Sequence, residues 1–160
     1  MKQFPVELLS QLMGALYGMQ YQHDHRQCPR GMVTAGLFEP DSLLLIAAGR
    51  NLVPARHAPC KCDDDADTHC QGSQTCKATH AEVRAINKAQ QEGNLDKARI
   101  LLSTRPPCEK CFHRIEETPV ELIVTTDQYP DRDRVRMFWE AQDKQWMVLP
   151  HAKYLHLRHT

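Results

Sequence analysis

Four residues in two short motifs have the types and spacing of a metal-dependent hydrolytic site. His80 and Glu82 stand two positions apart at the start of a predicted helix. Cys108 and Cys111 stand three apart at the start of another. Residues three apart lie on one face of a helix, so both thiols can share one ion. We therefore expect His80, Cys108 and Cys111 to bind a zinc ion that Glu82 does not ligate.

This ligand set is typical of a catalytic metal. A helix N-terminus favours thiolate over thiol, and Pro107 suits the first turn because its missing N–H has no helical partner to lose. Three protein ligands leave the fourth tetrahedral position of zinc open to water, whose pKa zinc lowers toward roughly 7. Glu82 is then placed to take a proton from water and to deliver it to the substrate.

Each motif alone has a simpler interpretation. The Cys-x-x-Cys pair could be a redox pair or half of a structural zinc site, His80 a surface histidine, and Glu82 a solvated helix residue. Together, H-x-E followed by P-C-x-x-C is the signature of the zinc deaminases, which replace the exocyclic amine of a base with oxygen. A carboxylate that holds no zinc favours catalysis over a zinc-stabilised binding module on the same scaffold.

On these motifs, HAE at 80–82 and PCEKC at 107–111, the sequence resembles the cytidine/deoxycytidylate deaminase superfamily over roughly residues 8–149. With histidine at the first ligand position, the His/Cys/Cys ligand set resembles that of the deoxycytidylate, tRNA-adenosine and riboflavin-pathway branches. Asn51 matches an asparagine that contacts the nucleotide in deoxycytidylate deaminases, and Tyr129 matches a tyrosine near the substrate. The resemblance implies conversion of dCMP to dUMP with release of ammonia, by a homo-oligomer, often a hexamer, regulated by dCTP or dTTP.

The sequence departs from that branch at several positions. Arg50 and Leu52 replace its usual tyrosine and second glycine, and STRPPCEKC at 103–111 differs from its TLSPCPDC. A divergent, viral-type enzyme fits these changes. So does a deaminase that acts on another or a modified nucleotide, on a base, or on adenosine in RNA.

Composition narrows the substrate and the compartment. The 160 residues are enough for one domain, and 41% hydrophobic with 25% charged residues is ordinary for a globular protein. Twenty basic and 20 acidic residues balance, which counts against a nucleic-acid partner and favours a small nucleotide. No apolar run could span a membrane, and no signal peptide is apparent. We expect a cytoplasmic protein, in the host cytoplasm if it is viral.

The hydrophobic pattern predicts a three-layer α/β/α deaminase-like fold around a five-stranded mixed sheet, in one domain over residues 1–160. Two apolar runs divided by Glu39-Pro40-Asp41 indicate an antiparallel hairpin, and later strands should be parallel. The tail from Pro150 gives no clear signal. Predicted helices cover 6–22, 81–91, 108–117 and 131–144, and predicted strands cover 31–38, 42–48, 100–103, 120–125 and 146–149.

A cysteine-rich insertion at about 50–79 has few aliphatic residues. Four cysteines could fold such a segment around a second, structural zinc ion. Cys28 is a rival ligand, supported by the family resemblance, and His57 and His69 are substitutes. A mobile loop with reactive thiols is the alternative, and the acidic run lacks the spacing of a calcium loop. The four cysteines are Cys60, Cys62, Cys70 and Cys76.

Arginines near the first predicted strand are candidates for a substrate phosphate. Arg26 and Arg30 flank its start, although surface arginines are commoner than ligand arginines. Trp139 and Trp146 are expected to be packing residues. The histidines at 151, 156 and 159 are expected to be ordinary tail residues.

Overall fold

The structure is a computed structural model that describes residues 4–22, 24–28, 32–58, 78–127 and 133–159. The predicted ligands of a structural zinc at positions 60, 62, 69, 70 and 76 lie outside them, as do Arg30 and Tyr129. The side chain of His57 is likewise not described. No helix among the described residues is both long and apolar enough to cross a bilayer.

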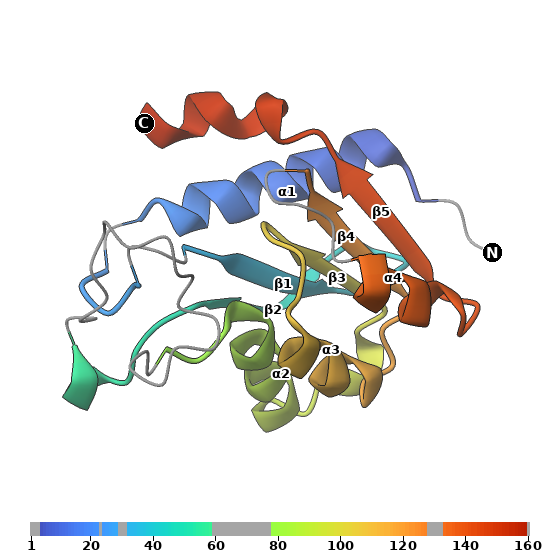
Figure 1. The fold of residues 1–160 in the computed structure, drawn as a ribbon, viewed down its shortest axis with the longest axis horizontal. Coiled ribbons are helices and arrows are strands. Elements are labelled where there is room, and N and C mark those ends of the chain that lie inside the picture. Colours follow the sequence, from blue (N-terminus) through green and yellow to red (C-terminus); the bar gives the residue numbers. More distant parts are fainter. Residues whose placement is uncertain (1–3, 23, 29–31, 59–77, 128–132, 160) are drawn as a thin grey trace.

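Helices and strands follow one another in the predicted order (Figure 1). The helices are α1 (Val6–Gln20), α2 (Ala81–Gln91), α3 (Glu109–Glu116) and α4 (Asp133–Glu140). The strands are β1 (Thr34–Phe38), β2 (Leu45–Arg50), β3 (Ile100–Ser103), β4 (Leu122–Thr126) and β5 (Gln145–Leu149). Short 3₁₀ helices are η2 (Ala55–His57), η3 (Leu95–Lys97) and η4 (His151–His159).

The five strands form one mixed sheet in the order β2-β1-β3-β4-β5. Strand β1 is antiparallel to both β2 and β3, whereas β3, β4 and β5 are parallel. Four strands, β2, β3, β4 and β5, therefore run in the same direction, and their carboxyl ends share one edge of the sheet. The start of β1 lies at that edge too, because Thr34 pairs with Arg50 and Ala35 with Ser103.

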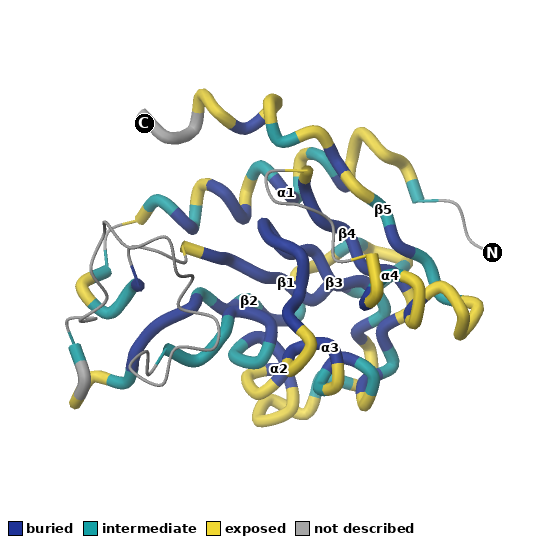
Figure 2. Tube along the Cα trace, viewed as in Figure 1, coloured by how far each residue is buried: buried dark blue, intermediate teal, exposed yellow. Residues whose placement is uncertain are grey.

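Helices cover both faces of the sheet, as expected (Figure 1). Helix α1 and η4 lie on one face, and α2, α3 and α4 on the other. Side chains alternate along β3, so Leu101 packs toward α2 and α3 while Ile100 and Leu102 pack toward α1. The central strands are buried along their length, and the outer faces of the helices are exposed (Figure 2).

Several predicted boundaries hold and others shift for physical reasons. Helix α2 ends where expected, with Gly93 at a φ of +69°, a left-handed conformation that glycine adopts readily. The second strand begins later than predicted, at Leu45, because the turn extends through Leu43, which has a φ of 54°. Helix α4 ends at Glu140 instead of Lys144, and Asp143 has a φ of 58° in the turn that follows.

Candidate active site and metal centre

The predicted substrate-binding and metal-ligating residues follow the carboxyl ends of neighbouring strands. Asn51 directly follows β2, and Cys108 follows β3 after a four-residue connection. This edge of an open α/β sheet is where ligands usually bind, since loops there converge between the layers. The strand directions therefore bring the two segments to one place.

Helix α2 supplies His80 and Glu82. His80 is the residue preceding the helix, with extended backbone, and Glu82 is in its first turn. Strand β2 meets this end of the helix closely, because a Cβ added to Gly49 would lie 2.4 Å from the carbonyl oxygen of Ala81. The missing side chain of Gly49 thus lets the histidine approach the carboxyl edge of the sheet.

Helix α3 supplies the two cysteines. Cys108 is the N-cap residue, and its Sγ accepts a hydrogen bond from the backbone N–H of Cys111 at 3.5 Å. Both side chains are buried. Thiolate at this position is favoured by the unpaired N–H groups and partial positive charge of a helix N-terminus.

The three predicted ligands converge. His80 Nδ1 lies 3.1 Å from Cys111 Sγ and 3.4 Å from Cys108 Sγ. All three donor atoms lie within 4.8 Å of one another. Tetrahedral zinc with ordinary Zn–N and Zn–S bond lengths separates neighbouring donors by roughly 3.6 Å, so the donors need little movement. One imidazole and two sulfurs are also the ligand types that zinc prefers.

The pKa shifts of the two thiols favour binding of a cation between them. A hydrogen bond from Cys111 lowers the pKa of Cys108 to about 3, and the same interaction raises the pKa of Cys111. A hydrogen bond with Cys108 also raises the pKa of His80. One thiol is therefore readily ionised while its neighbour resists. A divalent cation between the sulfurs would offset the repulsion between two thiolates.

Glu82 is buried beside the metal ligands. Only 3% of the residue is exposed, and burial raises the pKa of its carboxyl group. Ser103, at the end of β3, donates a hydrogen bond from Oγ to Glu82 Oε1 at 3.4 Å. A buried carboxylate with a raised pKa is suited to accept and return protons during a reaction.

Asn51 lies next to this centre. Leu52 and Thr79 form an antiparallel bridge, which places Asn51 opposite His80 in the pairing. Asn51 is 6% exposed, and its Oδ1 has no hydrogen-bond partner among the described residues. A buried amide oxygen without a partner is unfavourable, so it is available to a ligand that carries an N–H or O–H group.

The sequence match decides the family. The sequence model of the family described as "Cytidine and deoxycytidylate deaminase zinc-binding region" matches residues 9–126. The chain belongs to this family. Membership supports a hydrolase of C–N bonds with one zinc at the His80, Cys108 and Cys111 centre. A search of the curated proteins with this chain found no match.

Solved structures share the fold at low sequence identity. The dCMP deaminase from the cyanophage S-TIM5 in complex with dCMP and dUMP has a TM-score of 0.67 and 18% identity, covering 92% of this chain and 100% of that one. The guanine deaminase from Nitrosomonas europaea has a TM-score of 0.55 and 21% identity, covering 96% and 80%. These similarities confirm the predicted fold.

The structure also describes Arg26 and Cys28, two further residues predicted to bind a ligand. Arg26 contacts Asp24 through Nε at 3.3 Å and Nη2 at 3.1 Å, and 36% of its side chain is exposed. Cys28 is fully buried in the segment that pairs with residues 51–53. Trp139 and Trp146 are buried, as predicted for packing residues.

Three residues around the site were not predicted from sequence. Ser103 bonds to Glu82, Asp24 binds two arginines, and Arg105 is only 6% exposed in the loop before Cys108. A charged residue directly before two prolines and a ligand cysteine was the one available signal, for Arg105. The roles of the other two depend on strand pairing that local patterns do not reveal.

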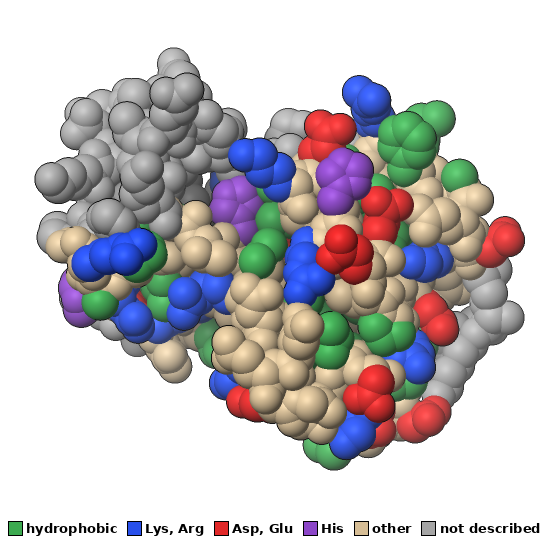
Figure 3. All heavy atoms as spheres, turned by 90° about the horizontal axis from the view of Figure 1, so that it is seen from below, with side chains coloured by type: hydrophobic (Ala, Val, Ile, Leu, Met, Phe, Trp, Pro, Cys, Tyr) green, Lys and Arg blue, Asp and Glu red, His purple; other side chains and the backbone are tan. Residues whose placement is uncertain are grey.

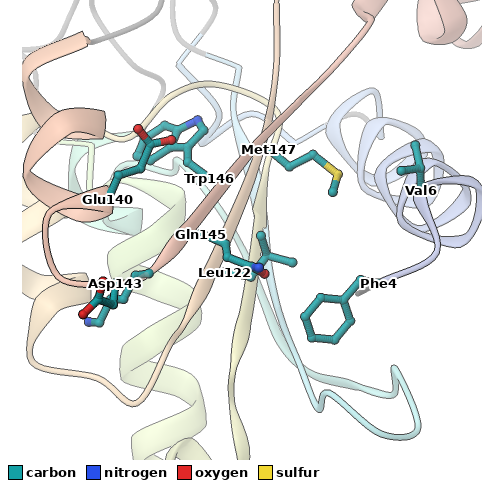
Figure 4. A pocket seen from close by; sticks show the side chains of 9 residues that line it. Phe4, Val6, Leu122, Glu140, Asp143, Gln145, Trp146 and Met147 are labelled. Atoms are coloured by element: carbon teal, nitrogen blue, oxygen red, sulfur yellow. The ribbon is translucent and has the colours of Figure 1, made fainter. Parts of the chain in front are cut away.

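A separate hollow of about 810 Å³ lies at the opposite edge of the sheet (Figure 4). Leu122 and Gln145, the first residues of β4 and β5, lie in its lining together with Phe4 and Trp146. None of the four candidate catalytic and ligand residues lines it. Its position at the amino ends of the strands separates it from the metal centre.

Proposed function

We propose that this deaminase hydrolyses dCMP to dUMP and ammonia at a zinc centre held by His80, Cys108 and Cys111. The observation that carries the proposal is the burial of Glu82 against the metal ligands. Holding zinc does not require this carboxylate, and burying a carboxylate costs free energy that only pairing or hydrogen bonding offsets. A non-catalytic zinc module would have no use for it.

The residues of the chain have distinct roles in this reaction. When bound by His80, Cys108 and Cys111, zinc would act as a Lewis acid that makes water nucleophilic at neutral pH. Glu82 accepts a proton from the attacking water, delivers it to the ring nitrogen, and then assists protonation of the departing amine. The oxygen of one water forms the new C–O bond at the carbon that carries the amine, one proton of that water goes to the ring nitrogen, the other goes to the amine, and the C–N bond breaks to release ammonia. Ser103 orients the carboxylate for these transfers.

Binding of the nucleotide is assigned to residues near the same edge. The amide of Asn51 accepts a hydrogen bond from the substrate, consistent with its partnerless Oδ1. Arg26 uses Nε and Nη2 on Asp24, and a guanidinium has further N–H donors for a phosphate. Tyr129 is retained as a substrate contact from the family resemblance.

Surface charge favours a small substrate. Basic and acidic side chains are interspersed on the face formed by α2, α3 and α4 (Figure 3). A surface that binds a long polyanion would instead gather positive charge along one path. This counts against RNA binding across the face formed by α2, α3 and α4.

Ammonia release tests the assignment. The protein should be incubated separately with cytidine, dCMP, dCTP, adenosine and guanine. We expect turnover of dCMP above all others. Turnover of guanine but not of dCMP would instead favour the second candidate, a base deaminase, which the fold similarity to the Nitrosomonas enzyme supports. Activity on cytidine alone would reject the monophosphate as substrate.

Two further assignments stay predictions. A second zinc, held by Cys60, Cys62, Cys70 and Cys76 or with Cys28 in one place, predicts close to two zinc ions per chain. A homo-oligomer predicts a mass in solution that is a multiple of the 18.4 kDa chain. Elemental analysis and light scattering measure these quantities directly.

A further inference from the structure

Arg50 and Asp24 form an ion pair beside the segment that carries Asn51, and we call these two residues the clamp. Arg50 Nη2 lies 3.2 Å from Asp24 Oδ2, and the two side chains are 17% and 12% exposed. Arg50 Nη1 donates hydrogen bonds to the carbonyl oxygens of Gln22 at 2.7 Å and Met19 at 3.4 Å. The end of β2 is thereby tied to the chain that leaves α1.

Asp24 also organises the turn that follows it. Its Oδ1 accepts a hydrogen bond from the backbone N–H of Arg26 at 2.9 Å. The carbonyl oxygen of Arg26 in turn accepts the backbone N–H of Val53 at 2.8 Å. Gln27 and Leu52 form an antiparallel bridge. The turn that Asp24 shapes therefore pairs with the residues directly after Asn51.

These contacts hold Asn51 on both sides along the chain. Its own N–H donates to the carbonyl oxygen of Val33 at 3.1 Å. The residue before it, Arg50, belongs to the clamp, and Leu52 after it bridges to Thr79, next to the ligand His80. The backbone of Asn51 is thus fixed relative to the metal centre, while its amide oxygen is left for a ligand.

We propose that Arg50 and Asp24 are positioning residues that set Asn51 in its substrate-binding position. The proposal rests on the proposed function, in which Asn51 contacts the nucleotide. A preformed binding group avoids the loss of freedom on binding that a mobile group would suffer. Neither clamp residue contacts the metal ligands or Glu82 in the described structure. Loss of the clamp should therefore weaken substrate binding more than the chemical step.

The first test separates binding from chemistry. Arg50→Gln and Asp24→Asn should each raise KM for dCMP about tenfold while kcat and zinc content change less than about twofold. Arg50→Lys keeps the charge but loses the fork of donors, so it should restore binding only in part. The control Arg136→Gln breaks an exposed pair with Glu140 on α4 and should leave KM unchanged.

The second test asks whether the effect passes through Asn51. In an Asn51→Ala background, Arg50→Gln should raise KM no further, because the positioned group is gone. An equal rise in both backgrounds would place the effect elsewhere, for example at Arg26, and would overturn the proposal. Hydrogen exchange of a peptide covering residues 50–54 supplies a readout without substrate. Exchange at the Val53 amide should be faster in both clamp variants.

The outcomes are distinguishable from failure of the proposed function. A wild-type protein that releases no ammonia from dCMP rejects the substrate assignment, and hydrogen exchange then decides on the clamp alone. Unchanged KM with unchanged exchange in both variants overturns the proposal. So does a parallel loss of zinc and kcat, which would make the pair a general support of the fold.

Discussion

Gly49 lies directly against the start of helix α2, where an added Cβ would be 2.4 Å from the carbonyl oxygen of Ala81 and 2.7 Å from the backbone nitrogen of Ala85. Backbone atoms of a helix cannot move aside individually. The contact therefore couples the end of β2, which leads into Asn51, to the helix that begins after His80. One small residue sets the distance between two parts of the site.

Gly49→Ala should displace α2 and lower both stability and zinc retention. Overpacking a well-filled site typically costs about 1–3 kcal/mol, and backbone contacts place this substitution toward the upper end. Urea unfolding and zinc analysis measure the two effects. Gly18→Ala is the matched control, because nothing lies within 4 Å of its added Cβ in exposed helix. That variant should gain roughly 0.5–1 kcal/mol, and a similar gain in Gly49→Ala would show that the contact is absent.

Ser103→Ala should lower kcat about tenfold and leave zinc content and KM near those of the wild type. A hydrogen bond to a charged group contributes about 1.5–3 kcal/mol, and the 3.4 Å separation places this one at the low end. Steady-state kinetics with dCMP measure the change. Thr125→Val is the control. It removes a buried hydroxyl from the neighbouring strand β4, where Thr125 Oγ1 accepts a hydrogen bond from Trp146. An equal loss of kcat in both variants would show that Ser103 has no specific role in catalysis.

Zinc removal should abolish turnover and lower the melting temperature. A metal present at about 100 times its Kd stabilises the native state by roughly 2.7 kcal/mol, which a chelator withdraws. Cys111→Ser should lose the catalytic equivalent of zinc before any chelator is added. Its melting temperature should then respond less to chelator than that of the wild type. An undiminished response would mean that the metal measured is bound elsewhere.

The lowered pKa of Asp24 predicts that the protein loses stability in acid. Hydrogen bonds from Arg26 lower its pKa from 3.8 to about 2, with Arg50 adding to the effect, while His25 lies 3.9 Å away. A carboxyl group whose folded pKa is depressed stabilises the protein above its unfolded value and loses this contribution as pH falls through the folded value. Allowing for screening by solvent, we expect about 1 kcal/mol. The stability difference between wild type and Asp24→Asn should therefore shrink between roughly pH 4 and pH 2, and a difference that is constant over this range would contradict the assignment.

Local sequence patterns predicted those elements whose signals are local. Helix α2 and strand β3 were predicted to the residue, because a ligand motif and a glycine bound the first and the turn signal Arg105-Pro106-Pro107 follows the second. The tail was missed for the opposite reason. Tyr154 is buried because its ring stacks on Tyr17 at 5.0 Å, a contact between the two ends of the chain. No pattern around Tyr154 announces that partner.

The candidate site divides in the same way. Histidine, glutamate and two cysteines were identified because zinc chemistry restricts which residue types and spacings can serve. Ser103 and Asp24 are common residues whose roles arise only from packing. The serine reaches Glu82 across 21 positions, and the aspartate reaches Arg50 across 26. Such partners become visible only when the strands are paired.

We expect Glu82 to move protons at a zinc centre that it does not help to hold. Glu82→Ala is the most direct test, with ammonia release from dCMP and zinc per chain measured on the same sample. We predict that turnover falls by at least about 10²-fold, the scale of general acid–base catalysis, while the zinc content equals that of the wild type. Retained turnover, or zinc lost together with activity, would contradict this role of Glu82.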